Sequence, residues 1–228
     1  MTATNTSEVL VEAAVETVAA AQSAARAGAD RLELCADLSV GGLTPHLSLV
    51  EEVCNATPLP VMVMIRPRAG DFVYSDDEVR RMEQDIRAIH AISPAGIVTG
   101  VLRHGAEIHT VPMQRLLSAA EGLPVTFHRA FDRLSNPAPA LEELIALGVR
   151  SVLTSGGASS ASAGVEVIAT LVRQARERIT IIAGGGVRAH NVGEVIERTG
   201  VREVHARFEN EEQILNLVWA VRNRSARA

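Results

Sequence analysis

The hydrophobic positions of this chain recur in short runs, and each run is followed by a longer amphipathic stretch. The run VMVMIR at 61–66 shows the pattern clearly, because apolar residues occupy both alternating faces until Arg66 interrupts one of them. A strand that is apolar on both faces is typical of a parallel sheet covered on both sides. Pro67 ends this strand, and Ser75 with Glu78 three residues later forms a capping box that predicts the next helix.

The same strand-then-helix unit repeats along the chain at spacings of roughly 20 to 35 residues, as expected for βαβ crossovers. The expected strands are 9–15, 31–35, 61–66, 96–102, 124–129, 151–155, 179–183 and 203–207. The expected helices are 17–27, 45–55, 76–91, 111–121, 139–147, 163–178, 191–198 and 211–223. Eight such units predict an α/β fold, a TIM (β/α)8 barrel, as a single domain over residues 1–228. A doubly wound sheet with a nucleotide cofactor is not expected, because the turn after Val15 has no glycine.

Composition excludes several classes of function. The net charge of -5 and the lack of a basic run argue against a nucleic-acid partner. No apolar run approaches the ~18 residues of a membrane span, and residues 1–8 do not resemble a signal peptide, so we expect a cytoplasmic protein without a membrane partner. All 22 basic residues are arginines, and the absence of lysine excludes Schiff-base chemistry and a P-loop. Cys35 and Cys54 form no CxxC motif, which suits a reducing compartment.

Polar residues end most of the expected strands, where TIM barrels carry their active sites. Strand alternation directs Glu12, Glu33, Arg66 and His128 into the barrel. Glu33 and His128 are the predicted acid/base pair, and Glu12 adds a second catalytic carboxylate. Arg66 is predicted to orient an anionic substrate group through bidentate hydrogen bonds. The competing interpretation is an Arg66 to Glu33 ion pair that only fills the barrel interior.

Other strand-end residues are candidates for binding a small anionic or sugar-like substrate. They are Arg129, Ser155, Gly184, Gly185, Gly186, His205 and Arg207. The three glycines follow a strand and precede a helix, so their amides suit a phosphate group. The loop after the last strand argues against phosphate, because Glu209, Glu211 and Glu212 would repel it and favour the helix dipole themselves. Alternation alone directs Arg129 outward.

Two metal-binding alternatives remain open from the residues. Cys35 with a nearby histidine would suit a soft metal, although a lone cysteine on a strand is more often a small buried hydrophobe. Glu12, Glu33, His128 and His205 would suit a divalent metal such as Mg or Mn. No contiguous ligand motif selects between these alternatives.

Several segments together resemble the CutC family, which is named for copper homeostasis. They are ADRLELC (29–35), GGLTP (41–45), VMIRPRAGDFVYSDDE (63–78), PVTFHRAFD (124–132), VLTSGG (152–157) and AGGGV (183–187). The resemblance implies a cytoplasmic TIM barrel, a homodimer, and copper as a ligand. The copper thiolate pair proposed for the family needs a cysteine two residues after Glu12. This chain has Ala14 there, so the resemblance leaves Cys35 and a histidine to bind copper.

Three hypotheses about function follow. The first is a copper homeostasis protein that binds copper through Cys35. The second is an enzyme of the isomerase, lyase or hydrolase type that acts on a small anionic or sugar-like metabolite through Glu33, His128 and Arg66. The third is a scaffold that acts only through contacts between subunits.

Overall fold

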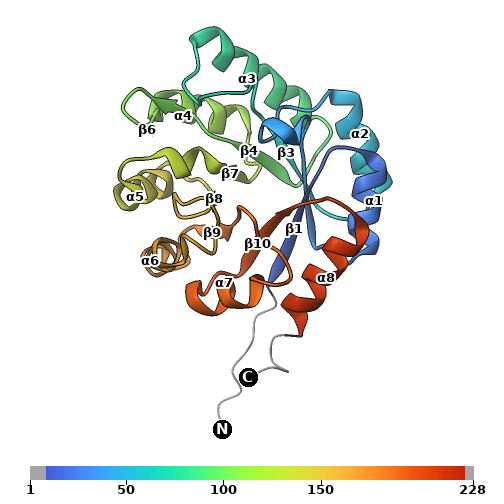
Figure 1. The fold of residues 1–228 in the computed structure, drawn as a ribbon. Coiled ribbons are helices and arrows are strands. Elements are labelled where there is room, and N and C mark those ends of the chain that lie inside the picture. Colours follow the sequence, from blue (N-terminus) through green and yellow to red (C-terminus); the bar gives the residue numbers. More distant parts are fainter. Residues whose placement is uncertain (1–8, 224–228) are drawn as a thin grey trace.

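The computed structural model describes residues 9–223, in which eight parallel strands close into a barrel inside a ring of helices (Figure 1). The barrel strands are β1 (Leu10–Val15), β2 (Arg31–Leu34), β3 (Val61–Met64), β4 (Gly96–Thr99), β7 (Val125–Phe127), β8 (Ser151–Thr154), β9 (Thr180–Ala183) and β10 (Glu203–Arg207). The helices are α1 (Val18–Arg26), α2 (Leu47–Ala56), α3 (Asp76–His90), α4 (Thr110–Ala119), α5 (Pro137–Leu147), α6 (Val165–Ala175), α7 (Val192–Thr199) and α8 (Glu211–Arg222). The expected TIM barrel is therefore confirmed, although positions 1–8 and 224–228 of the expected domain lie outside the described residues.

The barrel closes where the first strand meets the last. The strand order is β1-β10-β9-β8-β7-β4-β3-β2, and every pairing is parallel, including that of β1 with β10. The predicted capping box at the start of α3 is present: the Glu78 amide donates to Ser75 Oγ, and the Glu78 carboxylate accepts from the Ser75 amide at 2.7 Å. Within residues 9–223, every helix is too short or too polar to span a bilayer.

Three irregular segments were not predicted, and each follows a barrel strand. A 3-10 helix, η1 (Leu38–Val40), follows β2, and another, η2 (Arg129–Arg133), follows β7. After β4 the chain forms a small antiparallel hairpin of β5 (Leu102–Arg103) and β6 (Glu107–Ile108). The sequence predicted a strand over 96–102, but β4 ends at Thr99. The hairpin accounts for the difference, because its apolar residues Leu102 and Ile108 are buried in the core between the barrel and the helices and not along β4.

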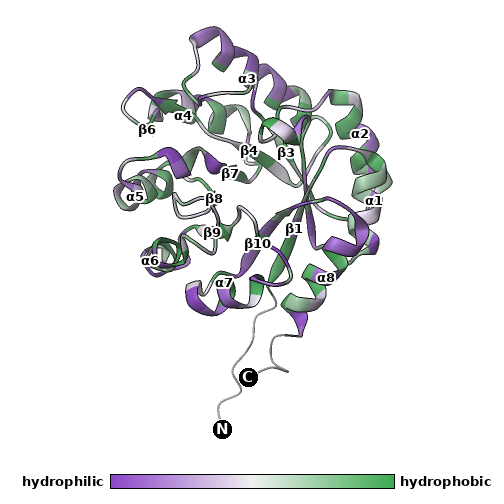
Figure 2. Ribbon diagram, in the orientation of Figure 1, coloured by the Kyte–Doolittle hydropathy of each residue, from purple (hydrophilic) through white to green (hydrophobic). Residues whose placement is uncertain are grey.

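The apolar side chains form two cores of unequal size. The larger core lies between the strands and the surrounding helices, most of which also carry hydrophilic residues (Figure 2). The smaller core lies inside the barrel and contains Cys35, Met62, Met64 and Val98 from β2, β3, β4 and their ends. The barrel interior beside β1 and β10 is instead polar, and this side carries the candidate site.

Candidate active site

A cavity of about 920 Å³ opens over the C-terminal ends of the barrel strands. The structure brings most of the predicted site residues together at this cavity, as a TIM barrel requires. Those that line it are Glu33, Arg66, His128, Arg129, Gly185, Gly186, His205 and Arg207. Those that do not line it are Glu12, Cys35, Ser155 and Gly184.

Glu12 lies below the cavity and links its neighbours on both sides. In the strand register, Glu12 on β1 pairs with His205 on β10 and with Arg31 on β2, so the three side chains point into the barrel together. Glu12 Oε1 lies 2.8 Å from Nδ1 of His205, and its Oε2 accepts a hydrogen bond from Nε of Arg31. Arg31 also donates to Glu203 at 2.6 Å. Both oxygens of the Glu12 carboxylate are therefore engaged.

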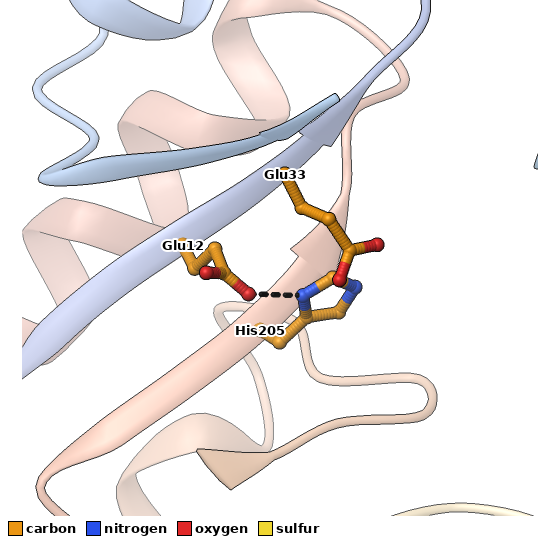
Figure 3. A group of neighbouring side chains, drawn as sticks. All are labelled: Glu12, Glu33 and His205. Carbon is orange, nitrogen blue, oxygen red and sulfur yellow. Dashed lines mark hydrogen bonds and ion pairs between the residues drawn. The ribbon is translucent and has the colours of Figure 1, made fainter. Parts of the chain in front are cut away.

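Glu33 lies one layer higher, against the imidazole ring of His205 (Figure 3). Its side chain is buried, with 3% of its surface exposed, and Oε1 accepts from the Cys35 thiol at 3.3 Å. The other oxygen, Oε2, has no hydrogen-bond partner in the described part of the chain. A buried carboxyl oxygen without a partner is energetically costly and marks a position where a ligand or a proton is expected.

The electrostatics of this cluster separate the two glutamates. Burial would raise the pKa of Glu12, but the hydrogen bond from His205 and the charge of Arg31 outweigh it and lower that pKa to about 2. Burial raises the pKa of Glu33, which has no arginine bonded to it. Burial would lower the pKa of His205, yet the carboxylates of Glu33 and Glu12 raise it. Glu12 is therefore ionised at neutral pH, whereas the pKa values of Glu33 and His205 are both raised and the charge of each affects the other.

The same three residues also have the composition of a metal site. Ligand atoms of Glu12, Glu33 and His205 lie within 4.8 Å of one another, so their spacing would admit a divalent cation. A cation would have to displace Arg31 from Glu12 and compete with His205 for the other oxygen. His128, which the sequence placed in this ligand set, is not part of the cluster. The hydrogen bonding therefore fits proton transfer better than metal binding.

His128 is held as a neutral hydrogen-bond donor. Its Nδ1 accepts from the Ala130 amide at 3.2 Å, so the ring hydrogen resides on Nε2, which is buried and has no partner within residues 9–223. Burial, with the charge of Arg66 nearby, lowers the pKa of His128 to about 3. The ring packs against Phe72 with centroids 4.8 Å apart, and an added Cβ at Gly100 would approach it to 2.8 Å. At neutral pH His128 is therefore uncharged with an unpartnered hydrogen-bond donor, and its lowered pKa makes it a weaker base than the predicted acid/base role assumed.

Arg66 holds two loops together beneath the rim. Its Nη1 donates to the carbonyl oxygens of Val40 at 2.9 Å and Gly42 at 3.1 Å, and its Nη2 donates to Gly70 at 3.2 Å. The guanidinium also lies over the Phe72 ring, 4.9 Å from its centroid. Among the described residues no Arg66 to Glu33 ion pair forms, so the competing interpretation of these two charges is wrong.

Asp132 holds together the cavity wall formed by the residues that follow β7 and end β8. Its carboxylate accepts hydrogen bonds from Thr154 Oγ1 at 2.5 Å, from the Ser155 amide at 2.9 Å and from Arg129 Nε at 2.8 Å. Arg129 lines the cavity, contrary to the outward direction that alternation predicted, because β7 ends before it and η2 turns its side chain. Ser155 is buried and bonds to Arg129 and Asp132, so its role is to position them.

Gly184 differs from the two glycines that follow it. Its amide donates to the Thr154 carbonyl oxygen at 2.9 Å, as part of the sheet. An added Cβ would lie 2.6 Å from Cδ1 of Leu153 and 3.4 Å from Cβ of His205, so the missing side chain leaves room chiefly for Leu153. Gly184 therefore shapes the floor, whereas Gly185 and Gly186 reach the cavity.

Cys35 does not fit the requirements of Cu(I). Burial, followed by the charge and the hydrogen bond of Glu33, raises the pKa of the Cys35 thiol well above its usual range. Copper binding needs a thiolate and a second soft ligand, and the described residues hold no second cysteine beside it, since Cys54 lies on α2. Cys35 behaves as a core residue packed with Met62 and Met64.

Sequence reasoning missed Arg31 and Asp132, for different reasons. Arg31 could have been identified from the sequence, because the alternation that directs Glu33 into the barrel also directs Arg31, two residues before it, to the same side. Asp132 lies in a 3-10 helix, where strand alternation carries no information. Its position within HRAFD, a segment that carries the family resemblance, was the available signal.

Comparison with known proteins places this barrel in a family. The family model described as the CutC family matches residues 9–210. A CutC protein of Pasteurella multocida is 47% identical over 195 residues, covering 86% of this chain and 80% of that protein. A human protein named copper homeostasis protein cutC homolog is 44% identical, covering 86% and 72%. The crystal structure of the putative copper homeostasis protein CutC from Streptococcus agalactiae is 36% identical, with a TM-score of 0.83 and coverage of 86% and 97%. The chain therefore belongs to the CutC family.

Proposed function

We propose that this protein is an enzyme that moves a proton on a small anionic metabolite, with Glu33 and His205 as its acid/base pair. The observation that carries the proposal is the Glu33 carboxyl, buried with one oxygen unpartnered, against a histidine at the floor of a large cavity. Such a pair accepts a proton at one group and returns it from the other near neutral pH. The reaction class is an isomerase or lyase step that begins with proton abstraction.

Each neighbouring residue supports a part of this chemistry. Glu12 bonds Nδ1 of His205 and leaves Nε2 for the substrate, as a carboxylate does when it orients a catalytic imidazole. Neutral His128 offers its Nε2 hydrogen to an oxygen on which negative charge develops. Arg66 fixes the loops that cover the site through three backbone carbonyl oxygens, so it positions the substrate-binding wall.

Deuterium exchange tests the proposal without requiring that the substrate or product be known. Pools of small anionic metabolites are incubated with the protein in D₂O, and loss of C–H proton signals is followed by NMR. The wild type should exchange a proton in at least one compound, and Glu33→Gln should reduce the exchange rate by roughly 10² to 10⁴-fold, the usual contribution of an acid/base residue.

A matched control separates chemistry from folding. Glu51→Gln changes an exposed glutamate on α2 that does not line the cavity, and it should exchange at the wild-type rate. Exchange that persists unchanged in both Glu33→Gln and His205→Gln would contradict the proposal. Arg66→Ala is a poor test of binding, because the substitution also releases the two loops that Arg66 holds.

Copper binding, a cytoplasmic location and a homodimer are predictions for this chain. Relatives carry the name copper homeostasis protein, but the donor set around Cys35 does not favour copper binding by this chain. A cytoplasmic location and a homodimer were implied by the family resemblance, and gel filtration with light scattering would test the dimer. The small-molecule partner is the part of these expectations that the cavity supports.

A further inference from the structure

We propose that the cavity binds the phosphate group of a phosphorylated metabolite at a site formed by Gly185, Gly186 and Arg207. This inference rests on the proposed function and narrows its substrate class, from a small anion to a phosphate monoester. Gly185 and Gly186 follow β9 and Arg207 ends β10, which are the seventh and eighth strands of the barrel. TIM barrels commonly bind phosphate at this position.

The charge of the cavity is opposite to that of the whole chain. Five arginines and two carboxyl groups line it, although the chain has a net charge of -5. Arg133 and Arg207 form no ion pair with any described residue, and Arg207 makes a single hydrogen bond of 3.4 Å, to the Leu38 carbonyl oxygen. Guanidinium groups without counter-ions in a concave site attract a dianion.

The two glycines add backbone donors to these charges. Gly185 and Gly186 both have positive φ, 98° and 71°, and within residues 9–223 neither amide donates to a protein acceptor. Consecutive free amides in such a turn form a concave anion site. The Gly185 carbonyl oxygen is held by the Ala161 amide at 2.8 Å, so the turn is fixed before any ligand arrives.

The acidic loop that argued against phosphate points elsewhere. Glu209 forms an ion pair with Arg188, and Glu211 bonds to Arg26 at 2.7 Å and to Ser23 on α1. None of Glu209, Glu211 and Glu212 lines the cavity in the described structure. Glu209 does lie beside Arg207 in a second, smaller cavity. The fold therefore reduces the repulsion expected from the sequence, and arginines outnumber carboxyl groups among the residues that line the main cavity.

Titration with inorganic phosphate tests the site. Binding is followed by ³¹P NMR and by the phosphate-dependent rise in melting temperature, for the wild type, Arg207→Gln and Arg173→Gln. Arg207 is exposed with one weak hydrogen bond, so its replacement should leave the fold intact. Arg173, which is exposed on α6 and donates to Thr170, supplies the matched loss of charge at a residue that does not line the cavity. We expect phosphate to bind the wild type and Arg173→Gln equally, and Arg207→Gln roughly tenfold more weakly or worse.

Several results would overturn the inference. It fails if the wild type does not bind phosphate, if Arg207→Gln binds as tightly as the wild type, or if acetate binds as well as phosphate. The proposed function is tested separately by Glu33→Gln, which should still bind phosphate. Phosphate binding without proton exchange in any compound would refute the proposed function alone. Exchange of an unphosphorylated compound that depends on Glu33, in a protein that does not bind phosphate, would refute the phosphate site alone.

Discussion

Glu12 and His205 lie 193 residues apart in the chain, yet their side chains meet at 2.8 Å because β1 and β10 close the barrel. The carboxylate fixes one nitrogen of the imidazole and turns the other toward the cavity side of the ring, where Glu33 lies. The closure of the barrel thus builds the proposed acid/base pair. Any change at Glu12 should affect both the stability of the barrel and the chemistry of His205.

Glu12→Gln should lower the free energy of unfolding at pH 7 by about 3 kcal/mol, the cost of removing one partner of a buried ion pair. Urea unfolding measures this value. Because the folded pKa of Glu12 is about 2, against an ordinary value of 4.5, its contribution is present above pH 4.5 and is lost as pH falls toward 2. The difference between wild type and variant should shrink over that range. Glu211→Gln, which breaks an exposed pair with Arg26, should change stability little, and an equal loss in both variants would contradict this account.

Glu33→Gln should alter the pH dependence of stability in the opposite sense. Burial raises the pKa of Glu33, so its stabilising contribution is present at pH values below the unfolded pKa and is lost as pH rises through the folded pKa. From pH 4.5 upward, the wild type should therefore lose stability relative to the variant. Melting temperatures of both proteins across that range measure the effect. If the melting temperatures of the two proteins changed with pH in parallel, the pKa of Glu33 would not be raised by folding, contrary to this prediction.

The sequence predicted the barrel and the side on which its charged residues lie, because alternation along a strand determines the face of a side chain. Alternation does not determine which residue on the next strand lies opposite. The Glu12 to His205 pair depends on the register of β1 against β10, which arises only when the eighth strand returns to the first. For the same reason the sequence assigned the acid/base role to His128, and to His205 only anion binding or metal ligation.

The sequence was least informative beyond the strand ends. Arg66 and Asp132 form hydrogen bonds to loops, and the paths of these loops follow no periodic pattern. The acidic residues after β10 were assigned to the phosphate region by proximity in sequence, yet Glu211 bonds to α1. Residue type alone therefore identified the charged groups, but the fold determined their partners.

Arg66→Gln should loosen the loops around η1 and after β3. The guanidinium donates to Val40, Gly42 and Gly70, and glutamine is too short to reach all three carbonyl oxygens. We expect amide hydrogen exchange to accelerate in residues 38–43 and 66–72, while the barrel strands keep their protection. Arg81→Gln is the control, since Arg81 is exposed on α3 and pairs with Asp85 of the same helix. Acceleration confined to the strands, or equal in both variants, would contradict the bridging role of Arg66.

Cys35→Ala should leave the Cu(I) affinity of the protein unchanged within about twofold, since a thiol that stays protonated is a poor ligand. The Cys35 proton is held by Glu33 at 3.3 Å inside an apolar cluster, and copper would have to expel it. Anaerobic competition with a coloured Cu(I) chelator measures the affinity. Cys54→Ala removes the half-buried thiol of α2 and controls for copper bound outside the barrel. A loss of tenfold or more in Cu(I) affinity that is specific to Cys35→Ala would identify Cys35 as a copper ligand. Glu33 would then belong to a copper site rather than to an acid/base pair.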